Sequence, residues 1–104
     1  MVKTRKIALE TVSFEKAGDA TDFFRRMLNS YSIGDPVSEA DTRHLKSLLV
    51  RHDEQDEKIG VGIHHFEVNA APDAFGGKCF WIVRTDGSKI DFSYPHCLKH
   101  KPYD

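Results

Sequence analysis

The sequence predicts an α+β domain with a short N-terminal strand, two antiparallel helices and an antiparallel sheet that contains a C-terminal hairpin. Three observations predict this class. Apolar residues recur at helical spacing within residues 19–52, whereas β-branched and aromatic residues dominate residues 61–68 and 79–92. Asp86-Gly87 interrupts the last segment with a sequence typical of a tight hairpin turn. We therefore expect both helices to pack on one face of the sheet.

Length and composition bound the organisation of the chain. Its 104 residues are 39% hydrophobic, which is enough for one core, so we expect a single domain over 1–104 that is ordered over about 6–98 and has 99–104 as a tail. The net charge of −1 excludes a protein that binds any duplex through overall positive charge. No apolar run approaches the roughly 18 residues that cross a bilayer, and no apolar signal core follows the N-terminus. We expect a cytoplasmic protein without membrane association.

The N-terminal half is expected to form one strand and two helices. Residues 6–12 carry β-branched and apolar side chains between charged flanks, which predicts a short strand. The next segment begins at Asp19, a candidate N-cap, and stops near Gly34. Its apolar stripe consists of Phe23, Phe24, Met27, Leu28 and Tyr31. Ser38 lies three residues before a carboxylate, a capping pattern that predicts a second helix over about 39–52.

The C-terminal half is expected to form the sheet. The strands are predicted at 61–68, 79–85 and 88–92, with a loop over 69–78. A two-residue turn at Asp86-Gly87 would have type I′ geometry, because both residues tolerate positive φ.

This turn fixes an expected register for the hairpin. One face would carry the pairs Arg84 with Lys89, Ile82 with Asp91 and Phe80 with Ser93. The other face would carry Trp81, Val83, Ile90 and Phe92, joined by Cys79 and Tyr94. Because the second face is almost wholly apolar, we expect it to pack against the helices, with Trp81 and Phe92 in the core.

Several motifs together resemble the DCL family, which takes its name from the plant protein "defective chloroplasts and leaves". They include Leu48-Leu49-x-x-His52, Lys58-Ile59-Gly60-Val61-Gly62-Ile63, Phe80-Trp81-x-x-Arg84-x-Asp86-Gly87-Ser88 and Asp91-Phe92-Ser93-Tyr94-x-x-Cys97-Leu98. The resemblance covers residues from about 14 to 98. It implies a link to chloroplast ribosomal RNA maturation, and a similar domain ends the largest subunit of plant-specific RNA polymerases. It supplies no catalytic residues that could be assigned to this chain.

The expected mixed face of the hairpin suggests a binding surface for RNA. It would offer an aromatic ring for base stacking beside positive charge. The candidate binding residues are Lys58, Phe80, Arg84, Lys89, Asp91 and Ser93. With the family resemblance, this pattern favours a non-catalytic RNA- or ribonucleoprotein-binding module connected with ribosomal RNA maturation. The same residues are also compatible with an ordinary cross-strand ion cluster.

Two other classes of function stay open from the sequence. A small hydrolase or nuclease could use the histidines, Asp91, and a nucleophile from Cys79, Cys97 or Ser93. A protein-interaction adaptor would instead expose a broad uncharged apolar patch. We expect a binding protein rather than an enzyme, because the sequence contains no nucleophile elbow.

The six histidines do not predict a metal site. The candidate ligands His52, His64, His65 and His96, with Cys79 or Cys97, do not occur at a recognised ligand spacing. His64 and His65 are adjacent in a predicted strand and would point to opposite faces. We therefore expect no metal and no cofactor, two reduced cysteines, and a structural role for His52 at the end of the second helix.

Overall fold

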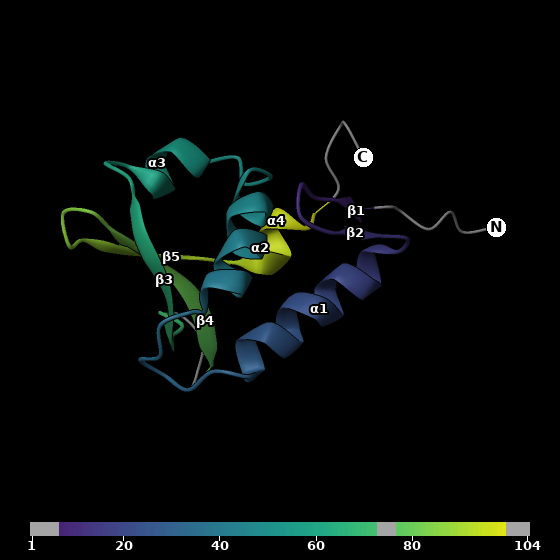
Figure 1. Ribbon diagram of the computed structural model, residues 1–104, viewed down its shortest axis with the longest axis horizontal. Helices are drawn as coiled ribbons and strands as arrows, with labels where there is room; N and C mark the ends of the chain where they lie inside the picture. Colours follow the sequence, from purple (N-terminus) through teal and green to yellow (C-terminus); the bar gives the residue numbers. More distant parts are fainter. Residues whose placement is uncertain (1–6, 73–76, 100–104) are drawn as a thin grey trace.

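The structure, a computed structural model, describes residues 7–72 and 77–99. It has the predicted α+β architecture, with a three-stranded antiparallel sheet on one side and the longer helices on the other (Figure 1). The strands of this sheet are β3 (Ile63–Ala70), β4 (Lys78–Arg84) and β5 (Lys89–Phe92), in the order β3-β4-β5. The helices are α1 (Ala17–Asn29), α2 (Glu39–Leu49), α3 (Gln55–Ile59) and α4 (Tyr94–Cys97). Within the described ranges, none of these helices is long and apolar enough to span a bilayer.

The N-terminal segment forms a small hairpin rather than the strand predicted over 6–12. Its strands are β1 (Ile7–Ala8) and β2 (Ser13–Phe14), which pair antiparallel. The amide of Leu9 donates to the carbonyl of Val12 across the turn at 2.8 Å. Ile7 is fully buried and its partner Phe14 packs against the core. The apolar residues of this segment therefore lie in two very short strands and in the turn between them.

Helix α1 begins before the predicted N-cap. Lys16, in extended conformation, occupies the N-cap position, and Asp19 lies in the first turn, where the helix dipole favours a carboxylate. Ser30 is the C-cap, so the helix ends before Gly34, which has φ of +95° in the following connection.

Helix α2 begins as predicted. Ser38 is its N-cap, and the Ser38 hydroxyl accepts a hydrogen bond from the Asp41 amide at 3.2 Å. The helix ends at Leu49, three residues before the predicted end.

The connection between α1 and α2 pairs with the sheet along the free edge of β3. The amide of Gly34 donates to the carbonyl of Val68 at 2.7 Å, and the amide of Val68 donates to the carbonyl of Asp35 at 2.9 Å. Further along, the amide of Val37 donates to the carbonyl of Phe66 at 2.9 Å. The two helices are thus joined by a segment that belongs to the sheet.

The hairpin between β4 and β5 has a different register from the predicted one. Phe80 lies opposite Phe92 and Ile82 opposite Ile90. The amide of Arg84 donates to the carbonyl of Ser88, and the amide of Gly87 donates to the carbonyl of Arg84. Gly87 has φ of +87°, as in a type I turn followed by a left-handed residue. The loop therefore contains three residues, Thr85 to Gly87, instead of two.

A change of one residue in the register reverses every side chain of a strand relative to its partner. In the structure Phe80, Ile82 and Phe92 all point into the core and are at most 1% exposed. Phe92 is in the core as predicted. Trp81, which we expected there, lies half-buried on the opposite face of the sheet. Strand β3 contributes the buried side chains of Phe66 and Val68 to the same core.

The remaining core comes from the helices. Phe24 of α1 and Leu45 and Leu48 of α2 are fully buried, and Cys97 of α4 is also fully buried. Phe23 of α1 contacts the ring of His44 of α2 edge-on, with centroids 5.3 Å apart. This core holds α1, α2 and α4 against one face of the sheet. The opposite face, which carries Trp81, is not covered by these three helices.

Three predicted features fall partly outside the described residues. Residue 6 of the predicted strand lies there, as do residues 73–76 of the predicted loop and residues 100–104 of the predicted tail. The described part of the loop is shorter than predicted, because β3 extends to Ala70 and β4 begins at Lys78.

Candidate functional site

One face of the sheet points away from α1, α2 and α4 (Figure 1). The strand register places both polar and apolar side chains on it. We call it the outer face, and its residues are His65, Glu67, Asn69, Cys79, Trp81, Val83, Lys89 and Asp91. Trp81 lies in its centre, because β4 is the middle strand and Trp81 is paired with Glu67 on one side and Asp91 on the other. The indole nitrogen of Trp81 donates to the carbonyl of Ala70 at 3.1 Å, which fixes the orientation of the ring.

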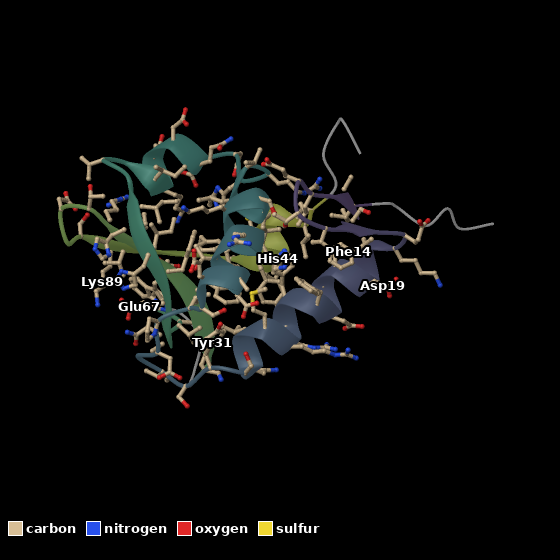
Figure 2. All side chains as sticks on the ribbon, in the orientation of Figure 1. Phe14, Asp19, Tyr31, His44, Glu67 and Lys89 are labelled. Carbon is tan, nitrogen blue, oxygen red and sulfur yellow. The ribbon has the colours of Figure 1, made fainter. Side chains whose placement is uncertain are left out.

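A charged cluster lies beside Trp81. Glu67 is only 6% exposed, and its Oε1 lies 2.8 Å from the ammonium nitrogen of Lys89, whose side chain is 50% exposed. Asn69 donates to the second carboxylate oxygen of Glu67 at 3.2 Å. Burial raises the pKa of Glu67. The hydrogen bonds from Lys89 and Asn69, together with the charge of Lys89, lower this pKa by more than burial raises it, so the pKa of Glu67 is below its ordinary value. Figure 2 shows Glu67 on β3 and Lys89 on β5, the two strands that flank β4, so this ion pair crosses the middle strand.

Two of the predicted binding residues serve the fold instead. Phe80 is fully buried, so it is not accessible for stacking. Arg84 donates from Nε to the carbonyl of Lys58 at 3.0 Å and from Nη2 to the carbonyl of Glu57 at 2.8 Å. It also donates to the hydroxyl of Ser88 at 3.3 Å. Arg84 thus attaches the C-terminal end of α3 to the hairpin.

The other predicted binding residues divide between two places. Lys89 and Asp91 lie on the outer face, as the strand register places them. Lys58 donates its ammonium group to the carbonyl of Asp91 at 2.8 Å, at the edge of the sheet. Ser93 is the N-cap of α4, where its hydroxyl accepts from the His96 amide at 3.3 Å. The structure therefore does not assemble these residues around Phe80 as predicted.

A second cluster, which the spacing of the histidines did not predict, brings His52, Asp53 and His96 together. The His96 Nε2 lies 2.7 Å from the Asp53 carboxylate, and the His52 Nδ1 lies 3.4 Å from the same oxygen. The two imidazole rings are 4.6 Å apart between centroids. One ligand atom from each residue lies within 4.8 Å of the others. We call this group the His-Asp-His cluster.

Burial and charge differ across this cluster. His52 is 6% exposed, and burial lowers its pKa, as do the nearby charges of His96 and Lys58. Asp53 is exposed, and its hydrogen bond with His96 lowers its pKa. His52 also accepts a hydrogen bond at Nδ1 from the amide of Glu54 at 2.9 Å. Burial and these charges therefore disfavour the protonated form of His52, which lies three residues after the last residue of α2 and contacts the backbone of Glu54.

A cleft of about 350 Å³ opens beside the cluster at the edge of β5. Its wall includes His52 and His96, the cations Lys58 and Lys99, and Ser93. The other candidate ligands are elsewhere. His64 and His65 contact each other through their Nδ1 atoms at 2.7 Å, and both belong to β3.

Two of the three candidate nucleophiles of the hydrolase hypothesis have structural roles in the fold. Cys97 is fully buried in the core and Ser93 is engaged as the cap of α4. Cys79 lies on the outer face, where its Sγ is 4.0 Å from the carbonyl of Ala70. Within the described residues of the C-terminal third, Cys79 is therefore the candidate nucleophile that lies neither in the core nor at a helix cap.

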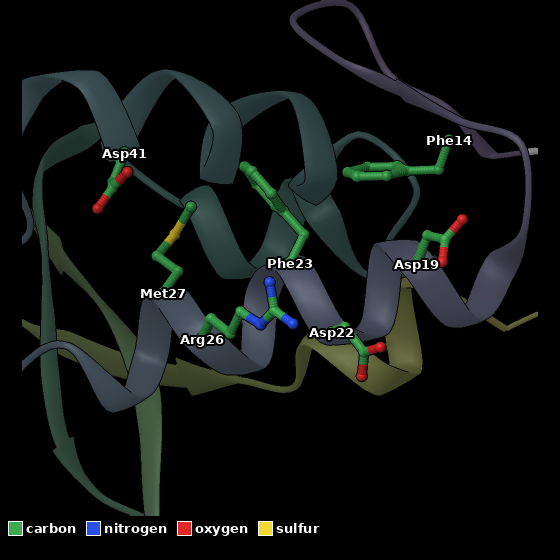
Figure 3. Close-up of a pocket in the computed structure, with 7 residues that line it drawn as sticks. All are labelled: Phe14, Asp19, Asp22, Phe23, Arg26, Met27 and Asp41. Carbon is green, nitrogen blue, oxygen red and sulfur yellow. The ribbon is translucent and has the colours of Figure 1, made fainter.

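A third surface feature is a groove between α1 and α2 with a volume of about 490 Å³ (Figure 3). Phe14, Phe23 and Met27 form its apolar part, and the carboxylates of Asp19, Asp22 and Asp41 with Arg26 lie around it. The Tyr31 hydroxyl donates to Asp41 at 2.6 Å. The groove is too acidic to match the broad uncharged patch expected of an adaptor.

Comparison with known proteins adds three findings. A solution NMR structure of an uncharacterised protein from Rhodospirillum rubrum superposes with a TM-score of 0.82 at 43% sequence identity, covering 93% of this chain and 91% of that protein. The chloroplastic protein DCL of Solanum lycopersicum is 44% identical over 80 residues, which are 74% of this chain and 36% of that protein. Subunit 1 of the DNA-directed RNA polymerase V of Arabidopsis thaliana is 36% identical over 73 residues, 69% of this chain and 4% of that subunit.

These findings correct one expectation and establish the family. The cytoplasmic location expected from the sequence is wrong, because the tomato relative is named as a chloroplastic protein. This chain spans about a third of the length of that relative. A family model described as "Protein of unknown function (DUF3223)" matches residues 25–98. Since this match covers most of the chain and includes both the outer face and the His-Asp-His cluster, the chain belongs to the DCL family.

Proposed function

We propose that this chain is a non-catalytic RNA-binding module that contacts single-stranded RNA through the outer face of its sheet. The observation that carries the proposal is the position of Trp81. The strand register places Trp81 in the centre of the sheet face that points away from the three core helices, diagonal to Lys89, whose side chain is 50% exposed. Antiparallel sheets that expose an aromatic ring in this way bind single strands by stacking the bases on the ring.

The charges of the outer face determine which part of RNA would be recognised. The ammonium group of Lys89 is balanced by Glu67, and Asp91 adds a second negative charge. Attraction of phosphates is therefore weak on this face, and stacking on Trp81 would supply most of the affinity. The expected binding is modest, favours single strands, and depends little on salt.

The relatives are compatible with a role related to RNA, and we propose that this role is in RNA maturation. One of them is a subunit of a DNA-directed RNA polymerase, and the segment that the family model matches, residues 25–98, contains Trp81 and the hairpin. This chain aligns with only 4% of the polymerase subunit, so the polymerisation activity of that assembly is not part of the proposal.

The proposal can be tested with intrinsic fluorescence, because Trp81 is the single tryptophan of the chain. Titration with a short single-stranded RNA should quench the fluorescence of Trp81, and a duplex of the same sequence should have little effect. Replacing the ring in Trp81→Ala should weaken binding of a dye-labelled RNA by roughly tenfold to a hundredfold, measured by anisotropy. Trp81→Phe should retain most of the affinity.

The controls separate stacking from general charge. Lys89→Ala should weaken binding only slightly, and the slope of log Kd against log salt concentration should stay below about 1.5. Arg43→Ala removes an α2 side chain that is 71% exposed on the other side of the molecule and should have no effect. Absence of quenching, or equal affinities of wild type and Trp81→Ala, would refute the proposal.

A further inference from the structure

We infer that the His-Asp-His cluster is a binding site for a divalent transition metal, with Zn²⁺ as the best match. This inference is independent of the proposed RNA-binding face, since the cluster lies at the junction of α2 and α4 and the outer face lies on the opposite side of the sheet from α4. The ligands would be His52, Asp53 and His96.

The distances within the cluster are close to those that a metal ion requires. With bonds of about 2.1 Å, two ligands of a tetrahedral Zn²⁺ are roughly 3.4 Å apart. The His52 Nδ1 already lies 3.4 Å from the Asp53 oxygen. The His96 Nε2 lies 2.7 Å from it, so this pair would have to open by about 0.7 Å to reach the tetrahedral separation. All three ligand atoms lie within 4.8 Å of one another, so local adjustments of these side chains and of the Glu54 amide would bring them to a metal ion.

The protonation states also suit a metal. The amide of Glu54 donates to the Nδ1 of His52, so this nitrogen carries a lone pair and the ring is neutral. Neutral imidazole is the form that binds metals. The metal would replace the Glu54 amide at this lone pair, and it would replace the proton that His96 shares with Asp53. A coordination bond is much stronger than either hydrogen bond that it would displace.

The composition of the cluster determines which metal fits. Two imidazoles and one carboxylate favour Zn²⁺ and its transition-metal neighbours, whereas Mg²⁺ and Ca²⁺ prefer oxygen ligands throughout. Three protein ligands leave a fourth position for water or an anion. That position adjoins the cleft of about 350 Å³, whose wall carries the acids Glu54 and Asp91 as well as Lys58 and Lys99, so water is the ligand expected there.

Metal binding would be measured by isothermal titration calorimetry of the chain after treatment with a chelator. We expect one Zn²⁺ per chain at this site, and Co²⁺ should give the visible absorption bands of a four-coordinate site. Mg²⁺ at the same concentration should give no heat of binding. Because His52 is buried and its replacement could unfold the chain, the test variants are His96→Ala and Asp53→Asn.

Each test variant should weaken Zn²⁺ binding at least tenfold and abolish the Co²⁺ bands, while its circular dichroism spectrum stays that of wild type. His65→Ala is the matched control, since His65 with His64 forms the alternative histidine pair on β3. This control should bind Zn²⁺ like wild type. The inference is overturned if the chain binds no Zn²⁺, if His96→Ala and Asp53→Asn bind it as well as wild type does, or if His65→Ala removes the binding.

Discussion

Replacement of Arg84 distinguishes a structural role from a ligand-binding role for this residue. In the structure its guanidinium group donates to the carbonyls of Glu57 and Lys58 at the C-terminal end of α3, and to the hydroxyl of Ser88. Arg84→Ala would leave these carbonyls without their charged donor. We therefore expect the variant to lose stability and to keep its affinity for RNA.

The size of the loss follows from the three hydrogen bonds. Each hydrogen bond from a charged group is worth about 1.5–3 kcal/mol when buried, and less where water can replace the donor. Arg84 is half-buried, and its two carbonyl acceptors lie in a short helix near the surface. We expect a decrease of about 2–3 kcal/mol in the free energy of unfolding. For a chain of this length the melting temperature should fall by about 8–15 °C.

Urea unfolding followed by circular dichroism would measure this loss, with RNA affinity determined on the same samples. Arg84→Lys should recover part of the stability, because an ammonium group can reach one carbonyl but not both. Arg43→Ala is the control for removing an exposed arginine and should change stability by less than about 0.5 kcal/mol. A variant Arg84→Ala that is as stable as wild type but binds RNA poorly would show that our assignment is mistaken.

Three further substitutions test separate features of the fold. The pKa of Glu67 is below its ordinary value in the folded state, so the stability that its carboxylate contributes is present above about pH 4.5 and is lost as the pH falls through the folded-state pKa. Wild type should therefore lose about 1 kcal/mol more than Glu67→Gln between pH 6 and pH 3 in urea unfolding. Ser38→Ala removes the N-cap of α2 and should lower the free energy of unfolding by about 1 kcal/mol, whereas Ser38→Asp should not. Gly60→Ala places a methyl group 2.9 Å from Arg84 Nε at a φ of +56°, and should reduce the melting temperature through a loss of about 1–3 kcal/mol.

The elements that the sequence predicted well are those whose signal is local. The stripe on α1 and the cap at Ser38 depend on residues that are close in sequence, and the structure contains both features. The strand positions are also close to prediction, since β-branched and aromatic residues mark them directly. The N-terminal hairpin was missed because its strands contain only two residues each, too few for a periodic pattern.

The binding face was mispredicted for one identifiable reason. Strand β4 is apolar on both faces around Phe80 and Trp81, so its own alternation does not show which side is buried. The number of residues in the hairpin loop then determines which side chains of β4 and β5 share a face. The positive φ at Gly87 is compatible with a loop of two residues and with a loop of three. Strand β5 does not decide either, because Ile90 and Phe92 can be matched to Trp81 and Val83 through a two-residue loop or to Phe80 and Ile82 through the three-residue loop that the structure contains.

The His-Asp-His cluster could not be predicted in this way, because Asp53 and His96 are 43 residues apart and meet only after α4 has docked. The docking is achieved by the neighbouring residue Arg51, which is 6% exposed and donates from Nε to the carbonyl of Cys97 at 2.8 Å. Arg51 and His52 thus contact the same short helix, one through its C-terminal carbonyl and the other through His96. A buried guanidinium that binds a helix C-terminus positions that helix without any metal, because its charge-assisted hydrogen bond is strong and specific in direction. The cluster is therefore already assembled by the fold, and a metal ion bound there would meet three ligands that Arg51 has brought into place.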